Sequence, residues 1–395
     1  MSLFFVKSRS NDLIFQIIKL SDTDIYKQYS DQYKITADHS RDILGLEIRN
    51  IDLELLNKLL NVFSNDDRFR NITGFNKNKL SLFLAGSLKD IKEFSQKFAK
   101  NVSPHQGDKV LVAIKRYEGY ENKVYKIGEE TFIFDKPYVM GILNVTDDSF
   151  SDGGRYLKTA DAANHAIEMI EDGADFVDIG GESTRPGSDG ITAEMEIQRV
   201  IPVIEKVIKE KPDAIISIDT TKSVVAEEAL KNGAKVINDI SAFNFDSNII
   251  EVAQKYDAGY VLMHMKGRPK EMQVNPHYDD VITEIYDFLF EKTEILENAG
   301  LSKIFIDPGI GFGKRIEDNF EILKRLEDFK SLGYPVLVGV SRKSFIGKTL
   351  NLEVENRDNA SSIVDSIAIR NGAKIIRTHN VKNGVQVCKL LKQLA

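Results

Sequence analysis

The chain has 395 residues, of which 42% are hydrophobic and 29% charged, and it carries a formal net charge of −7. This length fits two domains better than one, the composition argues against disorder, and the acidic balance disfavours a nucleic-acid partner. No apolar run approaches the ~18 residues of a membrane span. A single cysteine, Cys388, and the lack of a signal-peptide pattern predict a cytoplasmic protein.

Residues 1–120 form the first predicted domain, a small α+β domain of unknown role. They are rich in Asn, Asp and Lys and show weak periodicity. Helices are expected near 51–63 and 88–100, and short strands near 13–18, 43–49, 80–85 and 109–115. The charged clusters in this part are typical of a solvated surface, and no catalytic constellation is evident.

Residues 121–137 predict a short hairpin between the two domains. The segment VYKIGEETFIF (124–134) has two alternating runs around a turn at Gly128-Glu129. We expect this hairpin to cap the N-terminal mouth of the barrel that follows.

Residues 138–395 predict a (β/α)8 barrel of the α/β class. Apolar runs that end in polar residues alternate with helix-patterned segments, as in a parallel sheet buried on both faces. The runs lie at 138–144, 175–183, 214–222, 234–241, 259–265, 303–313, 334–344 and 373–380. Helices are expected at 159–172, 192–210, 222–232, 248–256, 278–299, 317–329, 358–371 and 381–393. Glycines at 173, 233, 300, 333 and 372 follow helical segments, where a C′ position favours positive φ.

Carboxylate and amide side chains follow three of these strands. Asp219 ends ISID, Asn238 and Asp239 end VIND, and Asp307 ends FID. Active sites of such barrels lie at the C-terminal strand ends, so these groups are expected at one rim. They could accept and donate hydrogen bonds to an amidine-like heterocycle. The alternative, strongest for Asp239, is that the carboxylate caps the next helix.

A basic, donor-rich corner follows the last two strands. Ser341-Arg342-Lys343-Ser344 ends the seventh strand, and Arg377-Thr378-His379 ends the eighth. The loops after these strands commonly bind phosphate in barrels, so an anionic substrate group is expected here. A solvated basic rim is the alternative.

Three further loops carry candidate residues. Asn144 leads into a polar, glycine-rich loop at 145–156, and Arg185 lies in a stiffened turn within GGESTRPGSDG (180–190). The first of these is typical of a mobile lid or of an ordinary surface connection. The third loop is the glycine-rich segment 309–314. Its Phe312, which lies between two glycines, could stack on an aromatic ring or plug the core.

Seven motifs in this order and spacing resemble dihydropteroate synthase, the folate-pathway enzyme family. They are MGILNVTDDSFSDGG, DIGGESTRPG, SIDTTK, VINDIS, DPGIGFGK, GVSRKSFIG and RTHNV. The resemblance covers about 125–395 and implies a transferase of a pterinylmethyl group. Such an enzyme joins 6-hydroxymethyl-7,8-dihydropterin diphosphate to 4-aminobenzoate, releases diphosphate, and is the target of sulfonamides.

The resemblance also implies roles for individual residues. Asp219, Asp307, Lys343, Arg377 and His379 would be catalytic. The pterin would contact Asp219, Asn238, Met263, Asp307 and Lys343. Aminobenzoate and the lid would involve Phe150, Thr184, Arg185, Pro186, Phe312 and Ser344. Diphosphate would be held by Asn144, Arg185, Arg377 and His379, with Mg²⁺ as the cofactor at Asn144.

Two departures from the family pattern stand out. Asp147 occupies a position where Pro is usual, which is expected to loosen the first loop, and Asn380 stands where Asp is common. The family suggests a homodimer of small-molecule-binding subunits. The alternatives are a pterin-binding methyltransferase-type barrel, which needs no diphosphate site, and a non-catalytic pterin-binding relative.

Overall fold

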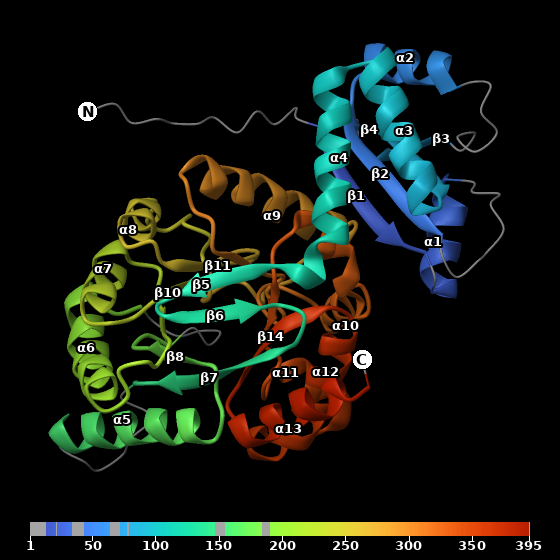
Figure 1. The fold of residues 1–395 in the computed structure, drawn as a ribbon. Coiled ribbons are helices and arrows are strands. Elements are labelled where there is room, and N and C mark those ends of the chain that lie inside the picture. Colours follow the sequence, from blue (N-terminus) through green and yellow to red (C-terminus); the bar gives the residue numbers. More distant parts are fainter. Residues whose placement is uncertain are drawn as a thin grey trace. The chain divides into compact units, whose positions relative to one another are not determined.

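The chain is divided into two compact units, which Figure 1 traces along the sequence. The N-terminal unit comprises residues 1–120 with Glu327–Gly333, and the barrel unit comprises Glu121–Leu326 and Tyr334–Ala395. The structure, a computed structural model, describes residues 13–20, 22–33, 43–63, 72–76, 79–146, 155–183 and 190–394. In these ranges, no helix is both long and apolar enough to cross a membrane.

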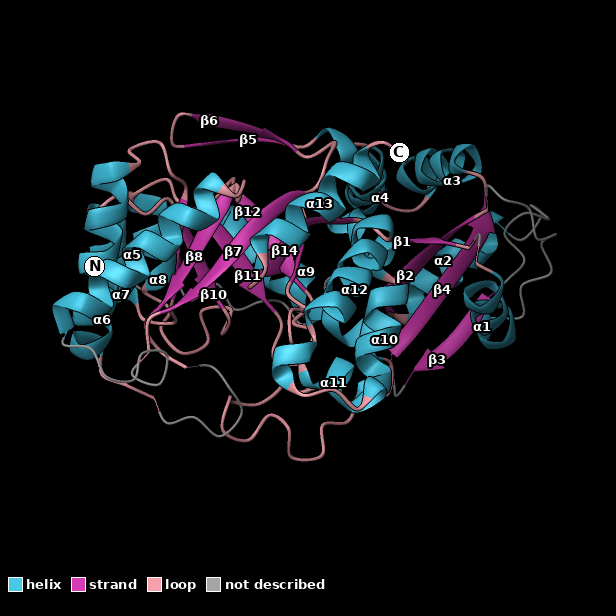
Figure 2. Ribbon diagram, turned by 90° about the horizontal axis from the view of Figure 1, so that it is seen from below, coloured by secondary structure: helices cyan, strands magenta, loops and turns pink. Residues whose placement is uncertain are grey.

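The barrel unit contains a closed parallel barrel, which confirms the predicted fold. The eight strands are neighbours in the order β10-β11-β12-β13-β14-β7-β8-β9. The barrel closes where β14, its last strand in the sequence, pairs with β7, its first. They are β7 (Tyr138–Asn144), β8 (Phe176–Gly180), β9 (Ile216–Asp219), β10 (Val236–Asp239), β11 (Gly259–Met263), β12 (Ile304–Asp307), β13 (Val336–Val338) and β14 (Ala373–Thr378). Figure 2 shows these strands surrounded by helices. Their apolar runs are buried because helices cover the outside and side chains fill the inside.

Each predicted barrel helix is present, with one of them divided. The helices are α5 (Arg155–Glu171), α6 (Ala193–Glu210), α7 (Ser223–Lys231), α8 (Ile249–Lys255), α9 (Val281–Asn298), α10 (Ile316–Lys324), α12 (Asp358–Arg370) and α13 (Val381–Lys392). The predicted 317–329 helix is α10 followed by a 3-10 segment, η4 (Leu326–Leu332). The short α11 (Ser344–Leu350) and η5 (Val354–Asn356) were not predicted, because so few residues give no periodicity. All five predicted C′ glycines have positive φ.

The hairpin of β5 (Val124–Ile127) and β6 (Glu130–Ile133) covers the N-terminal end of the barrel. Its Tyr125 and Phe132 share one buried cluster with Phe176 and Phe305. Phe176 is the first residue of β8, and Phe305 is the second residue of β12. The Tyr125 hydroxyl also donates to the Ile304 carbonyl oxygen at 2.7 Å. Figure 2 shows the hairpin across one end of the strands. The opposite end therefore carries the loops that can form a site.

The N-terminal unit is a four-stranded antiparallel sheet between helices. The strand order is β1-β2-β4-β3. The strands are β1 (Ile14–Lys19), β2 (Leu44–Ile51), β3 (Ile72–Asn76) and β4 (Lys79–Gly86), and the helices are α1 (Thr23–Tyr33), α2 (Leu53–Phe63), α3 (Leu88–Asn101) and α4 (Pro104–Glu118), followed by η2 (Tyr120–Asn122). Helices α2, α3 and α4 share one apolar cluster with the sheet, and α1 contributes to a second.

The predicted strand at 109–115 is wrong, since these residues lie in α4. The run KVLVAIK suggested a strand through its branched residues. Ser103, however, caps a helix that starts with Pro104, and Val110, Ala113 and Ile114 form its buried face at helical spacing. Packing on the sheet therefore outweighed local propensity.

The segment Glu327–Gly333 belongs to the N-terminal unit although the surrounding sequence is barrel. Ser331 Oγ accepts a hydrogen bond of 3.2 Å from the backbone N–H of Ile17, on the edge strand β1. Gln16 Nε2 donates to the Asp328 carbonyl oxygen at 3.3 Å. A late segment of the chain thus completes the first unit, which the linear order of the predicted domains did not anticipate.

Candidate active site

A buried ionic cluster joins four strands at the C-terminal end of the barrel. Arg377 of β14 donates through Nε to Asp178 Oδ2 at 2.6 Å and through Nη2 to Asp219 Oδ2 at 2.8 Å. Asn238 of β10 donates through Nδ2 to the same Asp178 oxygen at 2.8 Å. Asp219 pairs in register with both Gly180 and Asn238, which places the group at one level. Two carboxylates against one guanidinium leave acceptors that suit N–H donors of a heterocycle.

Burial sets the protonation of this cluster. Desolvation raises the pKa of Asp219 to about 7, while Arg377 acts in the opposite direction and Asp178 adds to the rise. The Asp178 side chain is 0% exposed, and its Oδ1 atom has no hydrogen-bond partner among the residues that the structure describes. A buried, unpaired carboxylate oxygen is costly, so a ligand that donates to it gains binding free energy.

Asp178 is the residue that sequence reasoning missed. It lies within a strand, between Val177 and Ile179, whereas the candidates were sought at strand ends. The available signal was a lone carboxylate in an otherwise apolar run. Such a residue is almost never fully buried without a partner, and here the partner comes from the eighth strand, 199 residues away.

Asp307 and Lys343 are two further charged residues of the rim, and each affects the pKa of the other. Burial raises the pKa of Asp307, and the Lys343 ammonium opposes this rise. Burial lowers the pKa of Lys343 to about 8, and Asp307 opposes that fall. Lys343 Nζ donates to the Ile310 carbonyl oxygen and lies 4.6 Å from the centroid of the Phe312 ring. The lysine therefore lies next to a half-buried aromatic ring, within electrostatic reach of the Asp307 carboxylate.

The loop that carries Phe312 is held against the end of β11. Gly309 has φ +71° and donates its backbone N–H to Asp307 Oδ1 at 2.7 Å. A Cβ atom there would lie 1.9 Å from the His264 carbonyl oxygen, so this position requires glycine. Buried Lys314 places Nζ 3.0 Å from His264 Nδ1 and 3.1 Å from the Phe312 carbonyl oxygen. These contacts fix the backbone on both sides of the phenyl ring.

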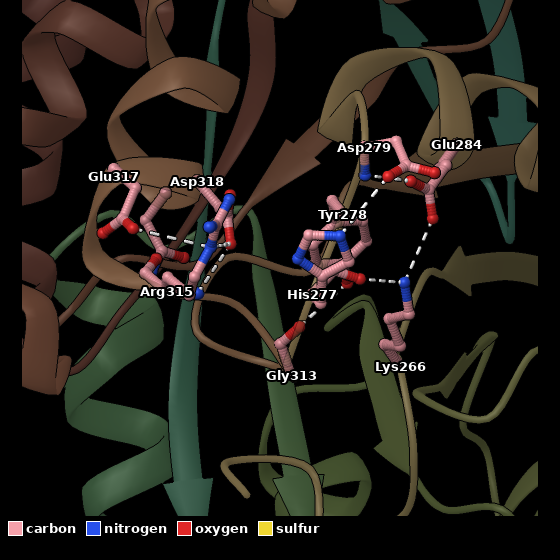
Figure 3. A network of polar contacts seen from close by, with 10 residues as sticks. Lys266, His277, Tyr278, Asp279, Glu284, Gly313, Arg315, Glu317 and Asp318 are labelled. Atoms are coloured by element: carbon pink, nitrogen blue, oxygen red, sulfur yellow. Dashed lines mark hydrogen bonds and ion pairs between the residues drawn. The ribbon is translucent and has the colours of Figure 1, made fainter. Parts of the chain in front are cut away.

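A second network, drawn in Figure 3, supports the same loop from outside. The Tyr278 hydroxyl donates to the Gly313 carbonyl oxygen at 2.8 Å. Lys266 Nζ lies 4.0 Å from the centroid of the Tyr278 ring and 3.0 Å from Glu284 Oε2. These contacts add supports that position the glycine-rich loop.

The predicted basic corner needs one correction. Arg342 forms a bidentate pair with Asp358 of α12, with N–O distances of 2.6 and 2.9 Å. The Arg342 guanidinium is therefore engaged by Asp358. Arg377 is the arginine that contributes its guanidinium to the ionic cluster at the rim. His379 Nδ1 lies 3.0 Å from Ser341 Oγ, which orients the imidazole. Ser344 is the first residue of α11 and is exposed.

The remaining candidates are less constrained. Asn144 ends β7 and is half-buried, and Met263 is buried in register with Asp307. Predictions for Asp147, Phe150, Thr184, Arg185 and Pro186 lie outside the described residues. Within the described ranges, no group of three or more His, Cys, Asp or Glu side chains could hold a metal ion.

A barrel with these carboxylates at its rim defines a class, the pterin binding enzymes, and the model of that family matches residues 140–379. Dihydropteroate synthase of Escherichia coli K12 is 45% identical over 258 residues, which are 65% of this chain and 91% of that protein. The Yersinia pestis dihydropteroate synthase structure, in a sulfonamide drug complex, is 40% identical with a TM-score of 0.65 and covers 69% of this chain and 99% of that chain. A Xanthomonas albilineans dihydropteroate synthase structure with 4-aminobenzoic acid is 39% identical with a TM-score of 0.64, covering 69% and 97%.

The chain belongs to the dihydropteroate synthases. It is a transferase of folate biosynthesis, as the resemblance of its motifs implies.

Proposed function

We propose that the rim residues perform the condensation of 6-hydroxymethyl-7,8-dihydropterin diphosphate with 4-aminobenzoate to 7,8-dihydropteroate and diphosphate. The observation that carries this proposal is the bridge of Arg377 between two buried carboxylates. It puts a cation for the diphosphate directly beside acceptors for the pterin.

The pterin is assigned to Asp219, Asn238, Asp307 and Lys343, with Met263 lining the pocket. Carboxylates accept from the amino and ring N–H groups of a pterin, whereas the Asn238 amide and the Lys343 ammonium can donate to its ring nitrogen and carbonyl acceptors. The Asp178 Oδ1 atom, which has no partner in the described ranges, adds a further acceptor.

The diphosphate is assigned to Asn144, Arg185, Arg377 and His379. Arg377 uses Nε and Nη2 for its carboxylate partners, and among the described residues no hydrogen bond engages Nη1, which is left for an anion. Mg²⁺ is assigned to Asn144, whose amide oxygen would be one ligand, because this ion commonly takes few protein ligands and completes its shell with phosphate oxygens and water. When bound, it would neutralise charge on the leaving diphosphate.

The aminobenzoate is assigned to Phe312 and Ser344, together with Phe150, Thr184, Arg185 and Pro186. Support comes from the half-buried Phe312 ring, which the loop contacts present next to Lys343. The Xanthomonas albilineans structure is one with 4-aminobenzoic acid, which is the acceptor we propose here.

The chemistry requires charge stabilisation and no covalent intermediate. The C–O bond between the pterin methylene carbon and diphosphate breaks, and its electron pair leaves on the diphosphate oxygen. The arylamine nitrogen forms the new C–N bond and gives up one proton to solvent or to the released diphosphate. Asp219 and Asp307 stabilise positive charge on the pterin, and Arg377 stabilises the departing anion. The rigid glycine-rich loop keeps the acceptor at attacking distance.

Diphosphate release from the purified full-length protein tests this function. The protein receives the pterin diphosphate, Mg²⁺ and 4-aminobenzoate, and release should require the arylamine and stop with a chelator. Pterin binding by calorimetry without release would favour the non-catalytic relative. Methyl transfer without release would favour the methyltransferase-type barrel.

The pH profile of kcat/KM for the pterin diphosphate is expected to be a narrow bell. This parameter reports groups of the free enzyme. It should rise with pH as Asp219, with its pKa raised to about 7 by burial, ionises and becomes an acceptor. It should fall as Lys343, with its pKa lowered to about 8 by burial, loses its proton. In Lys343→Arg the alkaline fall should disappear, and an unchanged alkaline limb would contradict the assignment.

A homodimer through the late barrel helices is proposed from two exposed apolar pairs. Ile363 and Ile367 on α12 are 63% and 48% exposed, and Leu390 and Leu394, at the C-terminal end of the chain, are 67% and 74% exposed. Each pair has i,i+4 spacing, and α12 contacts α13. Ile363→Asp should convert a dimer to monomers in sedimentation experiments, whereas Leu53→Asp, at an exposed position that begins α2, should not. Equal sedimentation of the Ile363→Asp variant and the unaltered protein would argue against this surface.

A cytoplasmic location stays a prediction from the single cysteine.

A further inference from the structure

We propose that Asp239 is a positioning residue for the pterin site, in that its carboxylate holds a strained turn directly after Asn238 and so keeps the Asn238 amide on Asp178. The inference rests on the proposed pterin role of Asn238. The donors that bind the Asp239 carboxylate come from Ser241, Phe243 and Tyr260, which lie outside the ionic cluster.

The turn after β10 is unusual in its backbone. Ala242 and Phe243 have φ values of 52° and 53°, and both are buried. Two consecutive non-glycine residues in the left-handed region are unfavourable, because the Cβ atom crowds the following carbonyl. Such a conformation persists where the surrounding structure holds it in place.

The Asp239 carboxylate supplies that hold. Its Oδ1 atom accepts from the Ser241 backbone N–H at 2.8 Å and from Ser241 Oγ at 2.7 Å. Its Oδ2 atom accepts from the Phe243 backbone N–H at 2.5 Å and from the Tyr260 hydroxyl at 2.6 Å. Four donors satisfy a carboxylate that is 0% exposed, so it has no capacity left for a substrate. The alternative that Asp239 caps the next helix is corrected as well, since α8 begins only at Ile249.

The far side of the turn is held by a lysine of α9. Lys292 Nζ lies 4.1 Å from the centroid of the Phe243 ring and 2.6 Å from Asn244 Oδ1. Two neighbouring elements therefore hold the turn: Tyr260 of β11 binds the Asp239 carboxylate, and Lys292 of α9 contacts Phe243 and Asn244.

The fixed turn also limits the backbone position of Asn238, because Asn238 directly precedes Asp239 in β10. Successive side chains of a strand point to opposite faces, so Asn238 faces the ionic cluster while Asp239 faces away from it. Asn238 Nδ2 reaches Asp178 only when the strand end keeps its register with Asp219. Loss of the turn would let the last residues of β10 rotate and remove the amide from the pterin.

The decisive experiment is a strain-relief rescue in the full chain. Asp239→Ala should raise KM for the pterin diphosphate by about tenfold, with a smaller effect on KM for 4-aminobenzoate. Adding Ala242→Gly should recover much of that loss, because glycine adopts positive φ without support. Ala242→Gly alone should remain near the unaltered protein. If a folded Asp239→Ala/Ala242→Gly protein shows no recovery, or if both KM values rise equally, the positioning role is wrong.

Two further measurements keep the test decisive. If Asp239→Ala does not fold, Tyr260→Phe removes a single donor, and an unchanged pterin KM in that variant would overturn the proposal. In Asp239→Asn, an amide N–H donor replaces one of the two accepting oxygens, so the pterin KM should rise while the KM for 4-aminobenzoate changes less, and equal rises in both would contradict the proposal. Diphosphate release by the unaltered protein tests the proposed function separately from all these variants.

Discussion

Replacing Arg377 by Ala is expected to reduce kcat/KM for the pterin diphosphate by about a thousandfold, because the only guanidinium of the described ionic cluster is lost. Asp178 and Asp219 would then face each other without a cation. The pKa of Asp219, already about 7, would rise further, so the carboxyl would be protonated at neutral pH and unable to accept from the pterin. The anion site would disappear in the same step.

Stability should change together with activity. Removing one partner of a buried ion pair typically costs about 3–5 kcal/mol of unfolding free energy. Arg342→Ala is the matched control, because Arg342 belongs to the same rim but pairs with Asp358. It should leave the pterin KM within about threefold, the scale of a weakened neighbouring contact. Diphosphate release and thermal melting measure both effects, and retention of a tenth of the activity by Arg377→Ala would contradict the proposed site.

Deletion of residues 1–120 is expected to destabilise the barrel rather than leave it intact. The segment Glu327–Gly333 folds with the N-terminal unit, and its Phe329 and Leu332 are fully buried. Without the first 120 residues, Ser331 loses the Ile17 N–H, and we expect both apolar side chains to become exposed. Each such exposure costs about 1.5–3 kcal/mol.

Melting temperature and kcat of residues 121–395, compared with the full chain, measure this dependence. The Escherichia coli relative aligns over 65% of this chain and 91% of its own, so it offers no counterpart to most of the N-terminal unit. A fragment that melts with the full chain and keeps its kcat would show that the unit is separable. Ser331→Ala in the full chain is the mild control and should cost only about 0.5–1.5 kcal/mol, as expected for one hydrogen bond.

Most of the predicted rim follows from the fact that active sites of these barrels lie at the C-terminal ends of the strands. Asp219, Asn238 and Asp307 each end an apolar run, and parallel strands must bring such ends to one edge, so their grouping was readable without a structure. The barrel itself followed from the same periodicity. Residues 109–115 were predicted as a strand and lie in helix α4. The local pattern failed there because packing against the sheet of the N-terminal unit decides the type of secondary structure.

Partners that lie far apart in the chain were beyond any local pattern. Asp178 looked like a lone carboxylate in a strand until barrel closure brought Arg377 to it, and Arg342 looked equivalent to Arg377 until α12 supplied Asp358. The strain after Asp239 and the late segment in the N-terminal unit arise in the same way. Periodicity and strand ends are local properties, so the barrel, the family and the rim that carries the chemistry could be predicted from the order of the residues. Which charges pair could not be predicted in this way, because pairing depends on distances between side chains that come together only when the chain folds.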